Sequence, residues 1–280
     1  MPITVTTLGT GSPLPDPNRA GPSTLVVAGG TRLLIDAGRG VLMRLVAAGT
    51  LPVMLDAVLL THLHSDHITD LNDVITTHWV MSTSPTPLHI YGPPRTGEVV
   101  AAILAMLAPD FTYRLAHHED LTWTPVVEVH ELGPPQTIQI GTATVSVRAT
   151  DHRPVEPTIG YRIEHAGASV AIAGDTVPCA GLDELCADAD VYVQTVIRAD
   201  LVAMIPSARL QDILDYHSSI EQAAQTAAAN RVRTLMCTHF VPALQAGQAD
   251  DWRERAAQHF DGSIILADDL SSITVGSEQP

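Results

Sequence analysis

Residues 57–67 read Ala-Val-Leu-Leu-Thr-His-Leu-His-Ser-Asp-His, and they combine a predicted strand with a cluster of histidines. Four apolar residues predict a buried strand, and the loop that leaves it carries three histidines and an aspartate. His62 and His64 are two positions apart, so both imidazoles can point at one ion, while Asp66 and His67 can reach a second ion. Imidazole and carboxylate donors suit zinc and its neighbours, and the stretch therefore predicts a metal site.

Three further candidate ligands follow apolar runs elsewhere in the chain. His152 follows a predicted strand, Asp175 follows Ala171-Ile172-Ala173-Gly174, and His239 follows Met236-Cys237-Thr238. Sheets of the α/β type usually place their sites at the carboxyl ends of strands. Taken alone, a His or Asp after a strand is more often a turn or cap residue than a ligand. Together with residues 62–67 they predict a site for two metal ions.

The rest of the chain alternates between strand-like and helix-like segments, which predicts an α/β protein with two mixed sheets packed face to face and helices outside. No segment resembles a linker, so we expect a single domain over residues 1–280. The expected strands are 3–8, 23–28, 32–36, 57–60, 88–91, 137–140, 142–150, 158–164, 168–173, 191–193, 234–238 and 263–266. The expected helices are 38–48, one that starts at Asp66 or His67, 96–107, a stretch from 199, 219–229 and 250–259.

The composition of the chain indicates which kinds of molecule it can bind and in which cellular compartment it works. The net charge is −16 and all 15 basic residues are arginine, so the surface repels polyanions on average. The sequence has no run of eighteen apolar residues and no basic, apolar start, so we expect neither a membrane span nor a secretory signal. Its three cysteines lack metal-ligand spacing, which favours reduced thiols and a cytoplasmic location.

The motif set resembles the metallo-β-lactamase superfamily, and in particular its ribonuclease Z and arylsulfatase-like branch, over nearly the whole chain. The actinobacterial members of that branch are especially similar. The resemblance implies a four-layer αββα sandwich. The motifs that carry it are residues 61–67, Thr150-Asp151-His152-Arg153-Pro154, Gly174-Asp175-Thr176, Thr238-His239-Phe240, Leu8-Gly9-Thr10-Gly11-Ser12-Pro13, Leu34-Ile35-Asp36-Ala37-Gly38, Gly160-Tyr161-Arg162-Ile163 and Tyr216-His217-Ser218-Ser219.

The resemblance also implies which residues hold the ions. Two divalent metals are expected, zinc first, with manganese or iron as alternatives that ligand types alone do not exclude. Asp175 would bridge them. The first ion would be held by His62, His64 and His152, and the second by Asp66, His67 and His239.

Three more residues receive roles in the expected reaction. Two ions a few Å apart lower the pKa of a bridging water and give a hydroxide, and Asp66 could accept a proton from that water. His217 could protonate the leaving oxygen or stabilise the pentacoordinate centre, or it could be a simple helix-start residue before the N-cap Ser218 or Ser219. Asp36 could fix the tautomer of a metal-bound histidine, or it could be a turn former before Gly38.

The expected activity is that of a metal-dependent hydrolase, with the phosphodiesterase cleavage of tRNA 3′ ends by ribonuclease Z as the nearest named reaction. Arg19 is the expected substrate contact, and the family suggests a homodimer. The chain departs from the family at Val193-Gln194-Thr195-Val196, where the family usually has His-Glu-Ala-Thr. Only about two dozen residues separate His152 from Asp175, too few for the family's tRNA-gripping arm. A hydrolase of small esters (aryl sulfates, cyclic phosphodiesters or lactones) and a non-catalytic metal-binding protein therefore stay open as alternatives.

Overall fold

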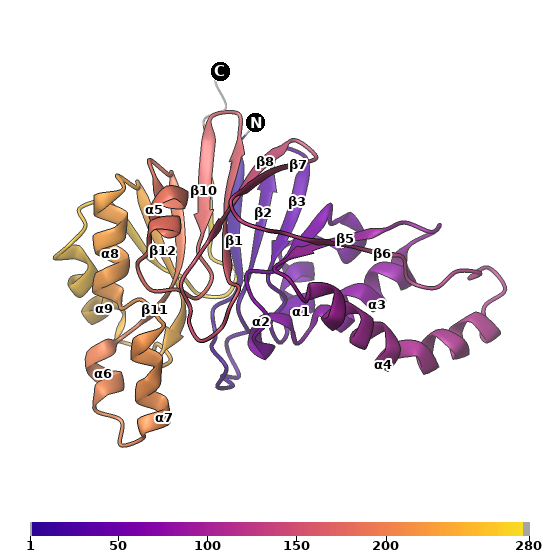
Figure 1. The fold of residues 1–280 in the computed structure, drawn as a ribbon, viewed down its shortest axis with the longest axis horizontal. Helices are drawn as coiled ribbons and strands as arrows, with labels where there is room; N and C mark the ends of the chain where they lie inside the picture. Colours follow the sequence, from indigo (N-terminus) through magenta and orange to yellow (C-terminus); the bar gives the residue numbers. More distant parts are fainter. Residues whose placement is uncertain (1, 277–280) are drawn as a thin grey trace.

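A computed structural model describes residues 2–276, and over this range two seven-stranded sheets lie face to face (Figure 1). In the first sheet β3, β4, β5 and β6 are parallel to one another, while β14, β1 and β2 pair antiparallel. Its order is β14 (Ser272–Val275), β1 (Ile3–Gly9), β2 (Ser23–Ala28), β3 (Thr31–Ile35), β4 (Ala57–Leu59), β5 (Leu88–Gly92) and β6 (Val127–Glu131).

The second sheet is also mixed. Strands β10 to β13 are parallel, while β7, β8 and β9 form antiparallel pairs that end on β10. Its order is β13 (Ser263–Leu266), β12 (Thr234–Val241), β11 (Val191–Ile197), β10 (Ala168–Ile172), β9 (Ile159–His165), β8 (Ala143–Ala149) and β7 (Gln136–Ile140).

The main hydrophobic core lies between the two sheets, because alternate side chains of each strand point to opposite faces. In β10, Val170 and Ile172 belong to this central core, whereas Ala171 between them packs with the helices on the outer face. Burying each Val, Ile or Leu side chain stabilises the fold by about 1.5–3 kcal/mol. The two sheets are therefore held together chiefly by apolar contact.

Helices cover the outer face of each sheet, which gives four layers (Figure 1). The first sheet is accompanied by α1 (Val41–Ala47), η1 (Pro52–Met54), α2 (Ser65–Ile68), α3 (Leu71–Met81) and α4 (Thr96–His117). The second is accompanied by α5 (Ala180–Cys186), α6 (Ala199–Ala203), α7 (Ala208–Gln211), η2 (Asp212–Asp215), α8 (Ile220–Ala229) and α9 (Ala249–Ala257).

The predicted architecture of two mixed sheets with outer helices is confirmed, and several predicted bounds are wrong. The helix expected over 96–107 continues to His117 through Pro109, and the helix expected from residue 38 begins at Val41 after a left-handed Gly40. Strands β6 and β14 and helix α5 were not predicted, and the helix expected to start at Asp66 or His67 is two helices, α2, which begins at Ser65, and α3. The Pro-rich surroundings of β6 hid its period-two pattern from the sequence analysis.

Helix α4 extends from the body of the molecule (Figure 1). Among the described helices it alone is long and apolar enough to cross a membrane by length and composition, and only 11% of its apolar window is buried. It also carries the ion pair between Asp110 and Arg114.

Strand direction creates the site. Strands β3, β4, β8 and β10 end at one edge of the sandwich, and the loops that leave them carry Asp36, His62, His152 and Asp175. His239 lies within β12, at a left-handed φ of 50°, where the register between β11 and β12 shifts. Residues far apart in the sequence therefore meet at this edge.

Candidate metal centre

All seven predicted ligands converge at this edge and form two groups. Within each group the donor atoms lie within 4.8 Å of one another. Six of the seven residues are buried, and His64 is half-buried. The first group is His62, His64, His152 and Asp175, and the second is Asp66, His67 and His239.

One oxygen atom, Asp175 Oδ2, lies between the two groups. The other carboxylate oxygen, Oδ1, accepts a hydrogen bond of 2.7 Å from Thr195 Oγ1, and this contact fixes the carboxylate. Asp175 Oδ2 is therefore placed to bridge two ions. It approaches one ring nitrogen of each of His217 at 3.2 Å, His67 at 3.4 Å, His239 at 3.6 Å, His62 at 3.8 Å and His152 at 3.9 Å.

The spacing within each group fits an ion in its middle. His64 Nδ1 lies 3.1 Å from His62 Nε2 and 3.3 Å from His152 Nε2. Asp66 Oδ2 lies 3.3 Å from His239 Nε2 and 3.7 Å from His67 Nε2. A tetrahedral ion with ligands at about 2.0–2.1 Å separates its donor atoms by roughly 3.3 Å, so both groups have the size that a zinc-like ion requires.

Asp36 and Thr61 fix which nitrogen of two histidines faces the site. His67 Nδ1 donates to Asp36 Oδ2 at 2.8 Å, and Thr61 Oγ1 donates to the same oxygen at 2.8 Å. His62 Nδ1 donates to Thr61 Oγ1 at 3.0 Å. Both rings therefore carry their hydrogen on Nδ1 and turn Nε2 toward the centre. This contact is the one that the orienting role of Asp36 requires.

His152 is oriented in the same way, by a backbone carbonyl. Its Nδ1 donates to the backbone carbonyl oxygen of Tyr216 at 2.8 Å, which leaves Nε2 facing His64. His67 Nε2 is buried and has no hydrogen-bond partner among the described residues. Leaving a buried polar atom unpaired is costly, and a metal ion at this place would satisfy it. The donor set thus fits a dinuclear metal site.

Electrostatics differ between the two groups of ligands. The first group is tuned to the protonation states that bind metal, whereas in the second the carboxylate of Asp175, acting against burial, raises the pKa of His67 and of His239. Burial and the neighbouring His67 lower the pKa of His62 well below its usual value, and burial lowers the pKa of His152 to about 4. Burial alone would raise the pKa of Asp175, but the imidazoles of His239 and His67 hold it well below its usual value. Neutral imidazoles and an ionised carboxylate are the ligand forms that metals need.

His217 lies beside this centre, just before α8. Its Nε2 is 3.2 Å from Asp175 Oδ2, and its Nδ1 is 3.3 Å from the Ile213 carbonyl oxygen. Both neighbours are acceptors, so either ring nitrogen of His217 can donate a hydrogen bond to the one beside it. Ser219 is the N-cap of α8, in a capping box with Gln222, so His217 precedes the cap and its side chain is free for another role.

Two other residues named by the sequence analysis lie in different surroundings. Gln194, at the place of the family's glutamate, accepts from the Tyr192 hydroxyl and donates to the Thr195 carbonyl, and it does not contact His217. Arg19 pairs with Asp268 at 2.7 Å and donates to the Thr10 hydroxyl. Its guanidinium is thus engaged by the protein itself.

Sequence reasoning missed two contacts that position ligands, the Thr195 hydroxyl on Asp175 and the Tyr216 carbonyl on His152. The first had a weak signal, since Thr195 is a polar residue within an apolar strand. The second had none, because any residue supplies a carbonyl oxygen.

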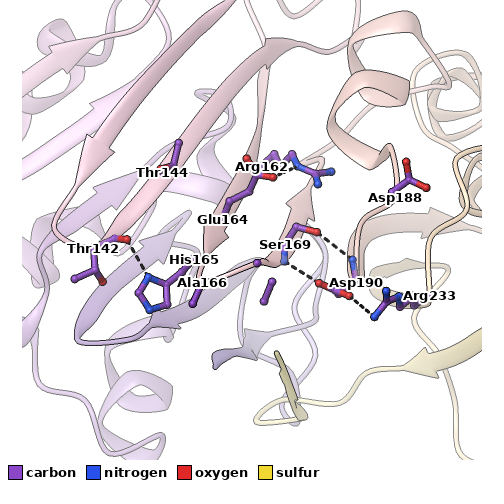
Figure 2. Close-up of a pocket in the computed structure, with 12 residues that line it drawn as sticks. Thr142, Thr144, Arg162, Glu164, His165, Ala166, Ser169, Asp188, Asp190 and Arg233 are labelled. Carbon is purple, nitrogen blue, oxygen red and sulfur yellow. Dashed lines mark hydrogen bonds and ion pairs between the residues drawn. The ribbon is translucent and has the colours of Figure 1, made fainter. Parts of the chain in front are cut away.

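A pocket at the opposite end of β10 differs from the metal centre in its chemistry (Figure 2). Four of its charged side chains pair with one another, Arg162 with Glu164 and Arg233 with Asp190, each at 3.0 Å, and the carboxylate of Asp188 pairs with Arg231 outside the pocket at 2.7 Å. The Ser169 backbone also donates to Asp190. Its charges are therefore already paired, and we place the functional site at the metal centre.

Comparisons with known proteins agree with this geometry. The model of the β-lactamase superfamily domain matches residues 31–240. The chain is 58% identical over 275 residues to a Ribonuclease Z of Mycolicibacterium paratuberculosis, and covers 98% of both chains. It is 54% identical over 275 residues to a Ribonuclease Z of Mycobacterium bovis, again with 98% of both chains covered.

Solved structures share the fold at lower identity. The metallo-β-lactamase fold protein YhfI from Bacillus subtilis superposes with a TM-score of 0.75 and 24% identity, with 98% of this chain and 99% of that chain covered. The short form of human tRNase Z gives a TM-score of 0.71 and 24% identity, with 98% and 100% covered. The expected metallo-β-lactamase fold is confirmed.

Proposed function

Since the chain belongs to the β-lactamase superfamily and, within it, to the ribonuclease Z family, we propose that it is a metal-dependent endonuclease that trims the 3′ ends of tRNA precursors. One observation carries the proposal: five imidazole nitrogens surround one oxygen of Asp175. A structural ion pair needs only one histidine beside a carboxylate, whereas a site for two metal ions would use a cluster of imidazole and carboxylate donors such as this one.

The seven ligands would hold two divalent ions, with zinc as our first choice and manganese or iron as alternatives for the same donors. When bound, such ions lower the pKa of a coordinated water and neutralise charge on phosphate oxygens. The protein's share of the chemistry is to fix the donors. Asp36, Thr61, Thr195 and the Tyr216 carbonyl do so through the contacts described above.

Two side chains would move the protons. Asp66 accepts the proton that the attacking water loses, and its carboxylate already lies 3.3 Å from His239 Nε2. As the new P–O bond forms and the old one breaks, His217 Nε2 donates a proton to the leaving oxygen. Buried positions for both groups keep these transfers from competing with bulk water.

A second candidate function is hydrolysis of a small ester. The chain between His152 and Asp175 is occupied by β9 and β10, which leaves no room for a long arm between these two ligands. The net charge of −16 also weakens contact with a polyanion. Both features favour a small substrate at the same centre.

The test offers three substrates to the metal-loaded protein: a precursor tRNA, bis-p-nitrophenyl phosphate and p-nitrophenyl sulfate. We expect cleavage of the precursor at its 3′ trailer and none by Asp175→Ala. Turnover of a small ester with intact precursor would replace the first function by the second. Full metal occupancy with no turnover of any substrate would leave a non-catalytic metal-binding protein.

We further propose that the enzyme works as a homodimer in the cytoplasm, by analogy with its family. Three cysteines free of disulfides fit a reducing compartment. Light scattering on the purified protein tests the dimer, and a mass of one chain would contradict it.

A further inference from the structure

A third group of metal-ligand side chains lies on β5 and β6, the last two strands of the first sheet. His89 is on β5, and Glu128 and His130 are on β6. The strands are parallel, with His89 opposite Glu128 and Tyr91 opposite His130. Because side chains two positions apart share a face of a strand, all four side chains lie on one face of the sheet.

The donor atoms of this group converge on one point. His89 Nδ1 lies 3.3 Å from Glu128 Oε2 and 3.3 Å from His130 Nε2, and all three donor atoms lie within 4.8 Å of one another. A tetrahedral ion with ligands at about 2.0–2.1 Å spaces its donors by roughly 3.3 Å. One imidazole nitrogen has one hydrogen, so it cannot donate a good hydrogen bond to both neighbours, whereas a shared ion would engage all three atoms.

Tyr91 holds one of the ligands in place. Its ring stacks on that of His130 with centroids 4.4 Å apart and planes 17° apart, and the same tyrosine packs against the core between the sheets. The imidazole is therefore fixed by packing before any ion binds. Such pre-arrangement reduces the ordering cost of binding.

The group is open to solvent. The side chains of His89 and Glu128 are 37% and 53% exposed, so an ion can enter from water and complete its shell with water molecules. Three protein ligands of this kind, two imidazoles and a carboxylate, are a known donor set for zinc. Nickel and copper ions also bind imidazole and carboxylate donors with high affinity in the Irving–Williams order.

We propose that His89, Glu128 and His130 form a separate, exchangeable site for a divalent transition ion, zinc first. It shares no residue with the seven-ligand centre. A bound ion would link β5 to the edge strand β6 and so stabilise an edge that is otherwise held on one side only.

The test measures zinc content after equilibrium dialysis of the wild type and of the double variant His89→Ala/His130→Ala. We expect the variant to bind one zinc equivalent fewer. The matched control is His165→Ala/His259→Ala, which removes two histidines on separate elements and should bind as much as the wild type. Equal zinc content in the wild type and the His89/His130 variant would overturn the proposal.

Glu128→Gln sharpens the result, because it keeps both imidazoles and removes one charged donor. The zinc ion at this site should bind more weakly in Glu128→Gln than in the wild type. An unchanged zinc affinity would remove Glu128 from the site. Anomalous diffraction from zinc-soaked wild-type crystals avoids any folding defect of the variants. We expect a peak between His89 and His130, and its absence would overturn the proposal. Because the dialysis test is a difference between two proteins, it does not depend on how many ions the seven-ligand centre holds.

Discussion

The molecule gathers imidazoles and carboxylates in two regions, the seven-ligand centre and the group on β5 and β6, and the two differ in their surroundings. In the centre, Asp175 and His62 are 3% and 0% exposed, whereas His89 and Glu128 in the outer group are 37% and 53% exposed. The contacts that orient the ligands also differ. In the centre, His62 and His67 donate hydrogen bonds to Thr61 and Asp36, whereas in the group on β5 and β6, the ring of His130 stacks on Tyr91.

The difference teaches that donor chemistry alone does not make a catalytic site. Burial strengthens electrostatic interactions and keeps water away, and outer hydrogen bonds fix the ring nitrogens that face the ions. We therefore expect tight, catalytic ions in the centre and an exchangeable ion in the outer group. The following experiments test this contrast.

The largest effect is expected from Asp175→Ala. It removes the oxygen that lies between the two groups of ligands and leaves five imidazole nitrogens without their shared anion. We expect loss of both central ions and of essentially all hydrolysis, measured as zinc content and precursor cleavage. Asp183→Ala, an exposed aspartate on α5, is the matched control and should retain both. An Asp175 variant that kept two central ions would contradict the bridging role.

His217→Ala should separate chemistry from metal binding. A positioned general acid contributes typically about 10²–10⁴-fold to the rate, so turnover should fall within that range. The zinc content should stay that of the wild type, because His217 is not among the seven ligands. The control is His259→Ala, an exposed histidine after α9. Wild-type turnover would remove His217 from the mechanism.

Asp36→Asn tests how much the hydrogen bond from His67 to Asp36 contributes to metal affinity in the seven-ligand centre. Asparagine tolerates the left-handed φ of 59° at this position, so the backbone should be retained. Loss of an outer carboxylate typically costs about 10–100-fold in metal affinity. Competition with a zinc chelator would measure this loss. Unchanged affinity would mean that Asp36 is only a turn former.

The smallest effect is expected in the outer group. Without added metal, His89→Ala/His130→Ala should lower the free energy of unfolding by about 1 kcal/mol, because both side chains are only half-exposed and His130 loses its stack on Tyr91. Turnover should match the wild type as well. Urea unfolding and precursor cleavage measure the two quantities. A large loss of either would show that the group is part of the scaffold or of the catalytic site.

The sequence was most informative where a ligand follows an apolar strand. The apolar run from Ala57 to Leu60 predicts β4. Because His62 to His67 closely follow this run, they had to lie at the carboxyl end of the strand. The layered fold followed from strand and helix periodicity together with the family's motifs. All seven predicted ligands meet in the structure because their strands end at one edge.

Other features could not be predicted, because they depend on contacts between residues that are far apart in the sequence or on segments next to prolines. The outer group joins His89 to His130 across 41 positions, and β6 between Pro-rich segments was not recognised, although Val127-Glu128-Val129-His130 alternates as a strand does. Helix α4 was predicted ten residues too short because Pro109 suggested an end, whereas the helix continues to His117. The orienting carbonyl of Tyr216 depends on tertiary contact alone.

The central claim is that seven side chains hold two ions around one oxygen of Asp175. Anomalous diffraction at the zinc edge from crystals of His89→Ala/His130→Ala tests it most directly, because that variant removes the outer site. We predict two peaks on either side of Asp175 Oδ2, one against His62, His64 and His152 and the other against Asp66, His67 and His239. A single peak, no peak, or peaks away from these residues would contradict the claim.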